Sequence, residues 1–367
     1  MNLLKSLPCA IVLGIMLSGC GQGSSSDGQS IGSAIVGGTP VVSGEFPSVV
    51  AITQNGRRIC SANLISEDTI ATAAHCIQAP DFSSRVQVMT YIEKLGPVLE
   101  KVTAGQKKPF NQLAIADQRA LMKRAIKLTM ISDAKALGVA TGLGQAGGQM
   151  KAQQIISSVE IDDRYVDIIF SSLFARTPLN QGQPNRPYIQ IADKVTLKIS
   201  KKLKGVTPIP FISANEHRDN VLLGQDVKLV GYGLKVDKRY LSASGEKISL
   251  WTSSLKAENA KPEAQQDTQV LEALNANIER ELPTFLKYMT LYQASGTKEQ
   301  VDLKLENYDH QLITLRAKAA QNNQGACSGD SGGPAFVKLA NGQLRQLGVI
   351  VTVDFCGRST HIAPAFR

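Results

Sequence analysis

The sequence predicts an all-β fold that is interrupted by inserted helical segments. Short apolar runs of the kind that form strands recur along the chain. They occupy Phe46–Ile52, Val195–Ile199, Val227–Val230 and Leu347–Thr352. Two other stretches space their apolar residues as a helix does, at Leu113–Leu128 and Pro262–Tyr292. We expect the second helix to end or bend around Pro283, because proline lacks the N–H that a helix needs.

The composition is that of an ordinary globular protein. The chain has 367 residues, 43% hydrophobic and 19% charged, which is enough for a sizeable core. The net charge of +9 is spread mainly over lysines, and the tightest cluster, Lys201, Lys202 and Lys204, has no interleaved aromatic residues. We therefore expect no nucleic acid partner. No Cys/His cluster indicates a metal and no glycine-rich loop indicates a nucleotide, so we expect no cofactor. We also expect a monomer.

The first residues read as an export signal. Lys5 provides a positive start, and Ala10–Leu17 is an apolar run too short to span a membrane. The sequence Leu-Ser-Gly-Cys ending at Cys20 looks like a bacterial lipobox, in which that cysteine is acylated. We expect a lipoprotein signal peptide over 1–19 and a tether or propeptide over 20–34. The alternative is an ordinary signal peptide in which Cys20 is incidental. Either kind of signal would export the chain to a compartment that permits disulfides.

A serine within glycines is the most informative feature of the chain. Residues 327–334 read Cys-Ser-Gly-Asp-Ser-Gly-Gly-Pro, with Ser331 as the central serine. A serine hydroxyl is a useful nucleophile only when a base removes its proton and N–H groups hold the developing oxyanion. Residues 72–76, Thr-Ala-Ala-His-Cys, offer His75 as the base, since an imidazole titrates near neutral pH.

These two motifs resemble those of the trypsin-like (chymotrypsin-fold) serine proteases. The resemblance implies two packed antiparallel six-stranded β-barrels with the catalytic groups in the cleft between them. It implies His75 as general base, Ser331 as nucleophile, and the N–H groups of Gly329 and Ser331 as the oxyanion hole. The Ser-His-Asp template is itself drawn from this family, so these roles are carried over from it. Esterase chemistry on the same residues, and a catalytically silent homologue that binds proteins, are the alternatives.

The resemblance does not cover the whole chain. The peptidase domain is expected over 35–367, with insertions at about 91–140 and 240–315. The family's triad also needs an aspartate between the histidine and the serine. Asp193 is the best candidate, because alternating apolar residues follow it as they do in the family's motif. The alternatives left open are Asp117, Asp162, Asp163 and Asp167.

The resemblance further implies an activation step. Residues 35–38, Ile-Val-Gly-Gly, match the terminus that zymogen cleavage exposes in the family, and the new ammonium of Ile35 would pair with Asp330. The alternative is a plain strand start. Ala34 precedes the cleavage point, so the processing enzyme must accept a small residue. Because Cys20 lies upstream, cleavage would also release the domain from its lipid and into the medium.

The remaining implications concern disulfides and specificity. The family's pattern pairs Cys60 with Cys76 and Cys327 with Cys356. It places Gly325, Thr352 and Asp354 at the specificity pocket. Gly325 stands where selection of Arg or Lys would need an aspartate, so we expect small or apolar residues at the cleavage site. Together these features predict a secreted or lipid-anchored serine endopeptidase of the bacterial outer membrane or periplasm, acting on protein or peptide substrates.

Overall fold

The structure is a computed structural model of the chain. It describes residues 35–77, 85–144, 150–175, 177, 179, 192–236, 238–293, 295–308, 312–317, 324–353, 356–357 and 359–365. The expected signal peptide, Cys20 and the tether therefore lie outside the described residues, as does Asp354.

The first barrel is closed and antiparallel. Its strands follow the order β2-β3-β4-β7-β6-β5. They are β2 (Val49–Gln54), β3 (Arg57–Leu64), β4 (Thr69–Thr72), β5 (Gly138–Ala140), β6 (Gln154–Ile161) and β7 (Val195–Ile199). Asn55 and Gly56 join β2 to β3 with φ values of 51° and 74°, the backbone that a two-residue hairpin prefers. This hairpin leads directly into the strand that carries Cys60.

The second barrel is built from the C-terminal half of the chain. Its strands are β8 (Asp226–Gly231), β9 (Glu299–Tyr308), β10 (Ile313–Arg316), β11 (Pro334–Lys338), β12 (Leu344–Val353) and β13 (Ser359–Pro364). The order β9-β10-β13-β12-β11-β8 closes through the β8–β9 pairing, and β1 (Thr39–Pro40) adds to β9. The prediction of two six-stranded antiparallel barrels is therefore confirmed.

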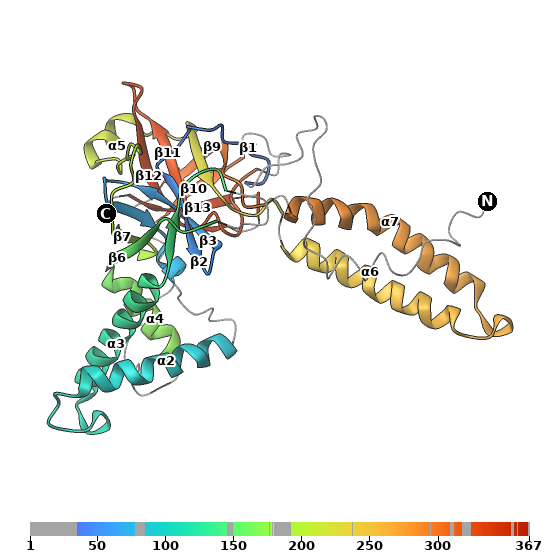
Figure 1. Cartoon of the computed structure of the whole chain (residues 1–367), viewed down its shortest axis with the longest axis horizontal. Coiled ribbons are helices and arrows are strands. Elements are labelled where there is room, and N and C mark those ends of the chain that lie inside the picture. The colour runs from blue at the N-terminus through green and yellow to red at the C-terminus, as the bar shows by residue number, and fades with distance from the viewer. Residues whose placement is uncertain are drawn as a thin grey trace. The chain divides into compact units, whose positions relative to one another are not determined.

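The all-β class with inserted helical segments holds only in part, because the long helices added to the barrels make the fold not purely all-β (Figure 1). The helices are α2 (Arg85–Thr103), α3 (Ile115–Lys135), α4 (Asp163–Phe174), α5 (Ala214–Asn220), α6 (Lys238–Asn259) and α7 (Thr268–Gln293), with short 3-10 turns η1 (Ala74–Ile77), η2 (Phe110–Gln112) and η6 (Glu263–Gln265). Helix α3 packs on α2, on α4 and on β6, whereas α6 and α7 lie side by side as a hairpin. The helices lie in the connections between strands, and the apolar pattern of the strands does not indicate what those connections contain.

The two helix predictions have different outcomes. The helix expected over Leu113–Leu128 is α3, where Ala125 is buried but Leu128 is 40% exposed. The helix expected over Pro262–Tyr292 is α7. It does not end at Pro283, since it continues to Gln293, and a bend at Pro283 stays a prediction. Helices α2, α4 and α6 were not predicted individually. None of the described helices is long and apolar enough to cross a membrane.

Candidate active site

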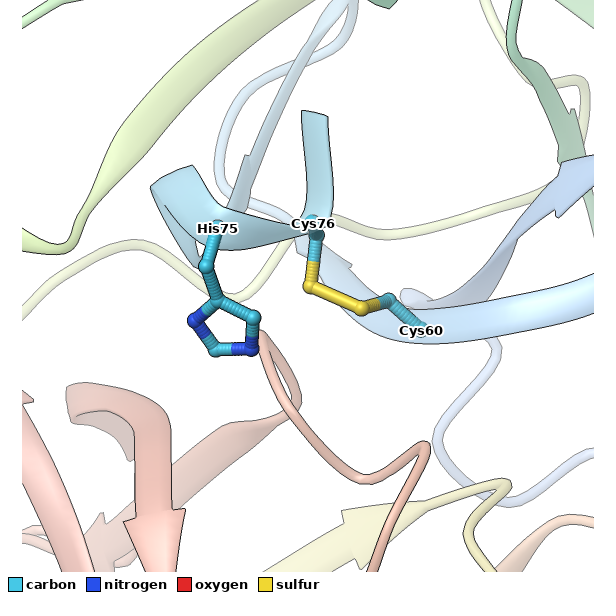
Figure 2. Close-up of side chains that lie close together, drawn as sticks. All are labelled: Cys60, His75 and Cys76. Carbon is cyan, nitrogen blue, oxygen red and sulfur yellow. A yellow bond between two sulfur atoms is a disulfide. The ribbon is translucent and has the colours of Figure 1, made fainter. Parts of the chain in front are cut away.

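His75 lies in η1, immediately after β4. Its neighbours Ala74, Cys76 and Ile77 are buried, so the turn is held by its own side chains while the imidazole stays 33% exposed. A disulfide joins Cys76 to Cys60 on β3, as the sequence predicted. Figure 2 shows the imidazole beside this disulfide. The sulfurs lie within 4.8 Å of the ring, but because they are bonded to each other they offer no thiolate to a metal.

Asp193 holds the other side of His75. Its Oδ2 lies 2.7 Å from Nδ1 of the imidazole, and its Oδ1 accepts the backbone N–H of His75 over 2.8 Å. The Asp193 side chain is fully buried just before β7, and β7 pairs with β4, the strand that precedes His75. The pairing of β4 with β7 thus brings together His75 and Asp193, which are 118 residues apart in the chain.

The other candidate acids lie elsewhere. Asp162 caps α4 and pairs with Arg164, Asp163 pairs with Lys127, and Asp167 pairs with Lys123. Asp117 is exposed in the first turn of α3. Of the five candidates from the sequence, Asp193 is the one that the structure brings to His75.

The environment of His75 favours its charged form. Burial lowers the pKa of the imidazole, but the charge of Asp193 and the hydrogen bond to it raise that pKa by more, so the pKa lies above the usual 6.5. The same carboxylate fixes the tautomer, because Nδ1 must carry a proton to donate to it, which leaves Nε2 free to accept one.

Ser331 lies on a loop packed against the histidine turn. Gly329 and Gly332 have φ values of 95° and 78°, which favour glycine. A β-carbon on Gly332 would collide with Thr72 and with the backbone N of Ala73. The carbonyl of Ser331 accepts the N–H of Ser61 over 2.9 Å. The loop is therefore bound to the same two strands, β3 and β4, that lead to the disulfide and to His75.

The loop orients two N–H groups. The carbonyl of Ser328 accepts the N–H of Leu234, and the carbonyl of Asp330 accepts the N–H of Gly333, each over 2.8 Å. In a trans peptide the carbonyl and the following N–H point in opposite directions. The N–H groups of Gly329 and Ser331 therefore point away from these donors, and a pair of such groups can hold an oxyanion.

The expected activation residues both lie in the core. Ile35 is fully buried in the second barrel, and Val36 forms a two-way backbone bridge with Gly325. Asp330 is also fully buried, and its carboxylate accepts the N–H groups of Gly233 and Cys327 over 2.6 and 2.9 Å. The pairing of Ile35 with Asp330 stays a prediction.

Burial dominates the electrostatics of Asp330. It raises the pKa of the carboxyl to about 7, against the lowering effects of the Cys327 and Gly233 N–H groups and of the Arg58 charge. Arg58, on β3, packs so closely on Gly329 that a β-carbon there would strike its guanidinium. Burial lowers the pKa of Arg58, while the charge of Asp330 opposes that shift.

The described pocket candidates flank this loop. Gly325 is buried, and Thr352 lies half-buried near the end of β12. Cys327 forms the expected disulfide with Cys356. The role of these residues in specificity stays a prediction.

Comparison with known proteins finds similarity over the part of the chain that carries His75. The family model described as Trypsin matches residues 35–124, which include β1 to β4 and His75. Residues 35–124 are therefore similar to the trypsin family of serine proteases. Trypsin alpha of Drosophila erecta is 29% identical over 109 residues, 29% of this chain and 43% of that protein. Trypsin Tyr p 3.0101 of Tyrophagus putrescentiae is 44% identical over 59 residues, 16% of this chain and 20% of that protein. The chain thus spans less than half the length of these curated relatives.

Three residues around the candidate site were missed by sequence reasoning. They are Arg58, Ser61 and Leu234, which contact or hydrogen bond the loop of Ser331. Each lies in or beside a strand and carries no motif of its own. To predict them, one would need to know that β3 and the end of β8 lie against the loop of Ser331, and a single sequence does not show this.

Proposed function

We propose that the protein is a serine endopeptidase that hydrolyses peptide bonds through an acyl-enzyme intermediate. The observation that carries the proposal is the buried Asp193 carboxylate on Nδ1 of a partly exposed His75, beside the loop of Ser331. A buried carboxylate that orients an imidazole toward a serine is the arrangement that activates a hydroxyl nucleophile. The similarity to the trypsin family supports peptides as the substrate class.

The proposed reaction has two halves. The Ser331 Oγ attacks the peptide carbonyl carbon while Nε2 of His75 takes the hydroxyl proton, and the Gly329 and Ser331 N–H groups hold the oxyanion. His75 then gives that proton to the leaving amine, and the C–N bond breaks. Water attacks the resulting ester, losing a proton to His75, and Ser331 leaves as the alcohol once His75 returns the proton. Asp193 stabilises the imidazolium in both halves.

We further propose activation by cleavage before Ile35. The buried positions of Ile35 and Asp330, and the bridge between Val36 and Gly325, support it. A new ammonium beside Asp330 would favour the ionised carboxylate, whose pKa burial now raises. Since Ala34 precedes this point, an enzyme that prefers small residues would activate itself.

The proposal includes export. Acylation of Cys20 would hold the unprocessed chain at a bacterial membrane, and cleavage before Ile35 would release the domain. N-terminal sequencing of material from the membrane fraction and from the medium tests both steps. A released form that begins elsewhere than Ile35 contradicts the coupling of activation to release.

Labelling with a fluorophosphonate tests the mechanism. The full chain, once cleaved before Ile35, should react at one serine, Ser331, and should cleave a casein or mixed-peptide substrate. Ser331→Ala should abolish labelling and lower turnover by about 10⁶. Ser48→Ala is the matched control, since the hydroxyl of Ser48 is buried without a hydrogen bond. A wild-type chain that binds peptides without labelling or turnover would instead be a catalytically silent homologue.

A further inference from the structure

Ser61 connects the strands that lead to His75 with the loop that carries Ser331. It lies on β3 between Cys60, whose disulfide partner adjoins His75, and the core of the first barrel. The side chain is fully buried. Its carbonyl accepts the Thr72 hydroxyl over 2.8 Å, so it is also bound to β4, the strand that leads into the histidine turn.

From this position Ser61 makes two bonds to the nucleophile loop. Its N–H donates to the carbonyl of Ser331 over 2.9 Å, and its hydroxyl donates to the carbonyl of Gly329 over 2.9 Å. The hydroxyl oxygen also accepts the N–H of Tyr232 over 3.0 Å, at the end of β8. Every polar group of Ser61 is thus used, and all of its partners lie in or beside the catalytic loops.

The hydroxyl acts on the peptide that lies between the two oxyanion donors. The carbonyls of Ser328 and Asp330 are held by backbone N–H groups, whereas the intervening carbonyl of Gly329 is held by the Ser61 side chain. The N–H of this peptide, from Asp330, donates to the carbonyl of Cys327 over 3.0 Å, and the φ of Gly329 is 95°, a conformation that favours glycine. When this peptide is held in one orientation, the angle between the N–H groups of Gly329 and Ser331 is set as well.

We propose that Ser61 is a positioning residue, which sets the orientation of the Gly329 and Ser331 N–H groups and the approach of Ser331 to His75. The proposal rests on the proposed serine peptidase function. Without the hydroxyl, the carbonyl of Gly329 and the N–H of Tyr232 lose their shared partner in a buried site, where unsatisfied groups are costly. The loop would then rotate to find other partners, and the oxyanion donors would rotate with it.

The experiment compares Ser61→Ala with Ser48→Ala in the full chain after its cleavage before Ile35. Ser48→Ala also removes a buried hydroxyl from the first barrel, but one that makes no hydrogen bond. Active sites are counted with a fluorophosphonate, so that loss of folded protein does not count as loss of rate. A peptide amide substrate then gives kcat and KM, and a peptide boronate reports on oxyanion binding.

We expect Ser61→Ala to lower kcat per labelled site about tenfold, since loss of an oxyanion donor itself costs about 10²–10³ and Ser61 acts at one remove. KM should stay within about twofold, and boronate affinity should fall in parallel with kcat. Ser61→Thr, which keeps the hydroxyl, should exceed Ser61→Ala in kcat per labelled site. Ser48→Ala should match the wild type.

Two results are contrary, and they differ. If the wild type labels and turns over, but Ser61→Ala matches Ser48→Ala in kcat per site and in boronate affinity, the role of Ser61 is overturned alone. If the wild type neither labels nor turns over, the proposed function fails and the role of Ser61 falls with it.

Discussion

Gly233 donates its N–H to Oδ1 of Asp330 over 2.6 Å, and a β-carbon on Gly233 would overlap the same carboxylate. A second hydrogen bond also restrains the carboxylate, because its other oxygen accepts the N–H of Cys327. The glycine therefore makes room for the buried charge as well as donating to it. This contact fixes how closely β8 approaches the loop of Ser331.

Substituting this glycine should disturb the loop. We expect Gly233→Ala to lower the free energy of unfolding by about 1–3 kcal/mol, as overpacking of a buried site does, and to lower kcat through the displaced loop. Gly105→Ala is the matched control, since a β-carbon there meets no atom within 4 Å, and its effect should stay within about 0.5 kcal/mol. Urea unfolding measures both. Equal stabilities would show that the carboxylate moves freely.

The raised pKa of Asp330 makes the stability of the unprocessed chain depend on pH. The folded carboxyl has a pKa of about 7 against 3.8 unfolded, so between these values the folded state holds a proton that the unfolded state has lost. Stability from this group is then complete below about pH 4 and decreases as pH rises to about 7. The decrease should be a few kcal/mol, because each pKa unit corresponds to about 1.4 kcal/mol.

Thermal unfolding of the full-length Ser331→Ala chain from pH 4 to 8 measures this slope. Adding Asp330→Asn should flatten it, since an amide does not titrate in this range. Cleavage before Ile35 should also reduce it, because a nearby ammonium lowers the carboxyl pKa. A slope that Asp330→Asn leaves unchanged would assign the effect to another group.

The sequence motifs located the residues of the candidate site better than the elements around it. His75, Ser331 and the two disulfides were placed by short motifs, because nucleophile loops and histidine turns need specific neighbours in the sequence. Asp193 was reached through the strand pattern that follows it, and the pairing of β7 with β4 explains why the long spacing did not matter. The all-β class held only in part, because helices such as α4 and α6 lie in connections between strands, where no strand pattern indicates them.

Pro283 and Ser61 show two further limits. Pro283 was expected to end or bend a helix. It does not end α7, which continues to Gln293 beside its partner α6, so tertiary packing outweighs the loss of one N–H. Ser61 has no sequence signature at all. Its importance comes from β3 meeting the nucleophile loop 268 residues later in the chain.

The pKa of His75 predicts how an Asp193→Asn variant should behave. Asp193 raises that pKa against the effect of burial. In the asparagine variant burial remains and the charge is gone, so the acid limb of kcat/KM should move to lower pH. Turnover should fall about 10⁴-fold, because an amide can stabilise the wrong tautomer. A pH profile per labelled site measures both. Asp117→Asn, at an exposed alternative acid, should change neither quantity.

The base of the α6–α7 hairpin is closed by a buried ion pair. Lys235, just before α6, lies 3.3 Å from Glu299 at the start of β9, and the two side chains are 6% and 1% exposed. Lys235→Met would leave Glu299 charged in the core, so the free energy of unfolding should fall by about 3–5 kcal/mol. Lys235→Met combined with Glu299→Leu should recover most of it, since apolar replacement of a whole buried pair is often neutral.

Lys228→Met provides the comparison on the same two strands. Lys228 pairs with Asp302 between β8 and β9 over 2.9 Å, but both side chains are partly exposed, so the loss should be at most about 1 kcal/mol. Guanidinium denaturation ranks the variants. If Lys235→Met costs no more than Lys228→Met, burial does not set the strength of the Lys235–Glu299 pair. If the double variant is no more stable than Lys235→Met, the pair stabilises by attraction, and the isolated charge is not the cause of the loss.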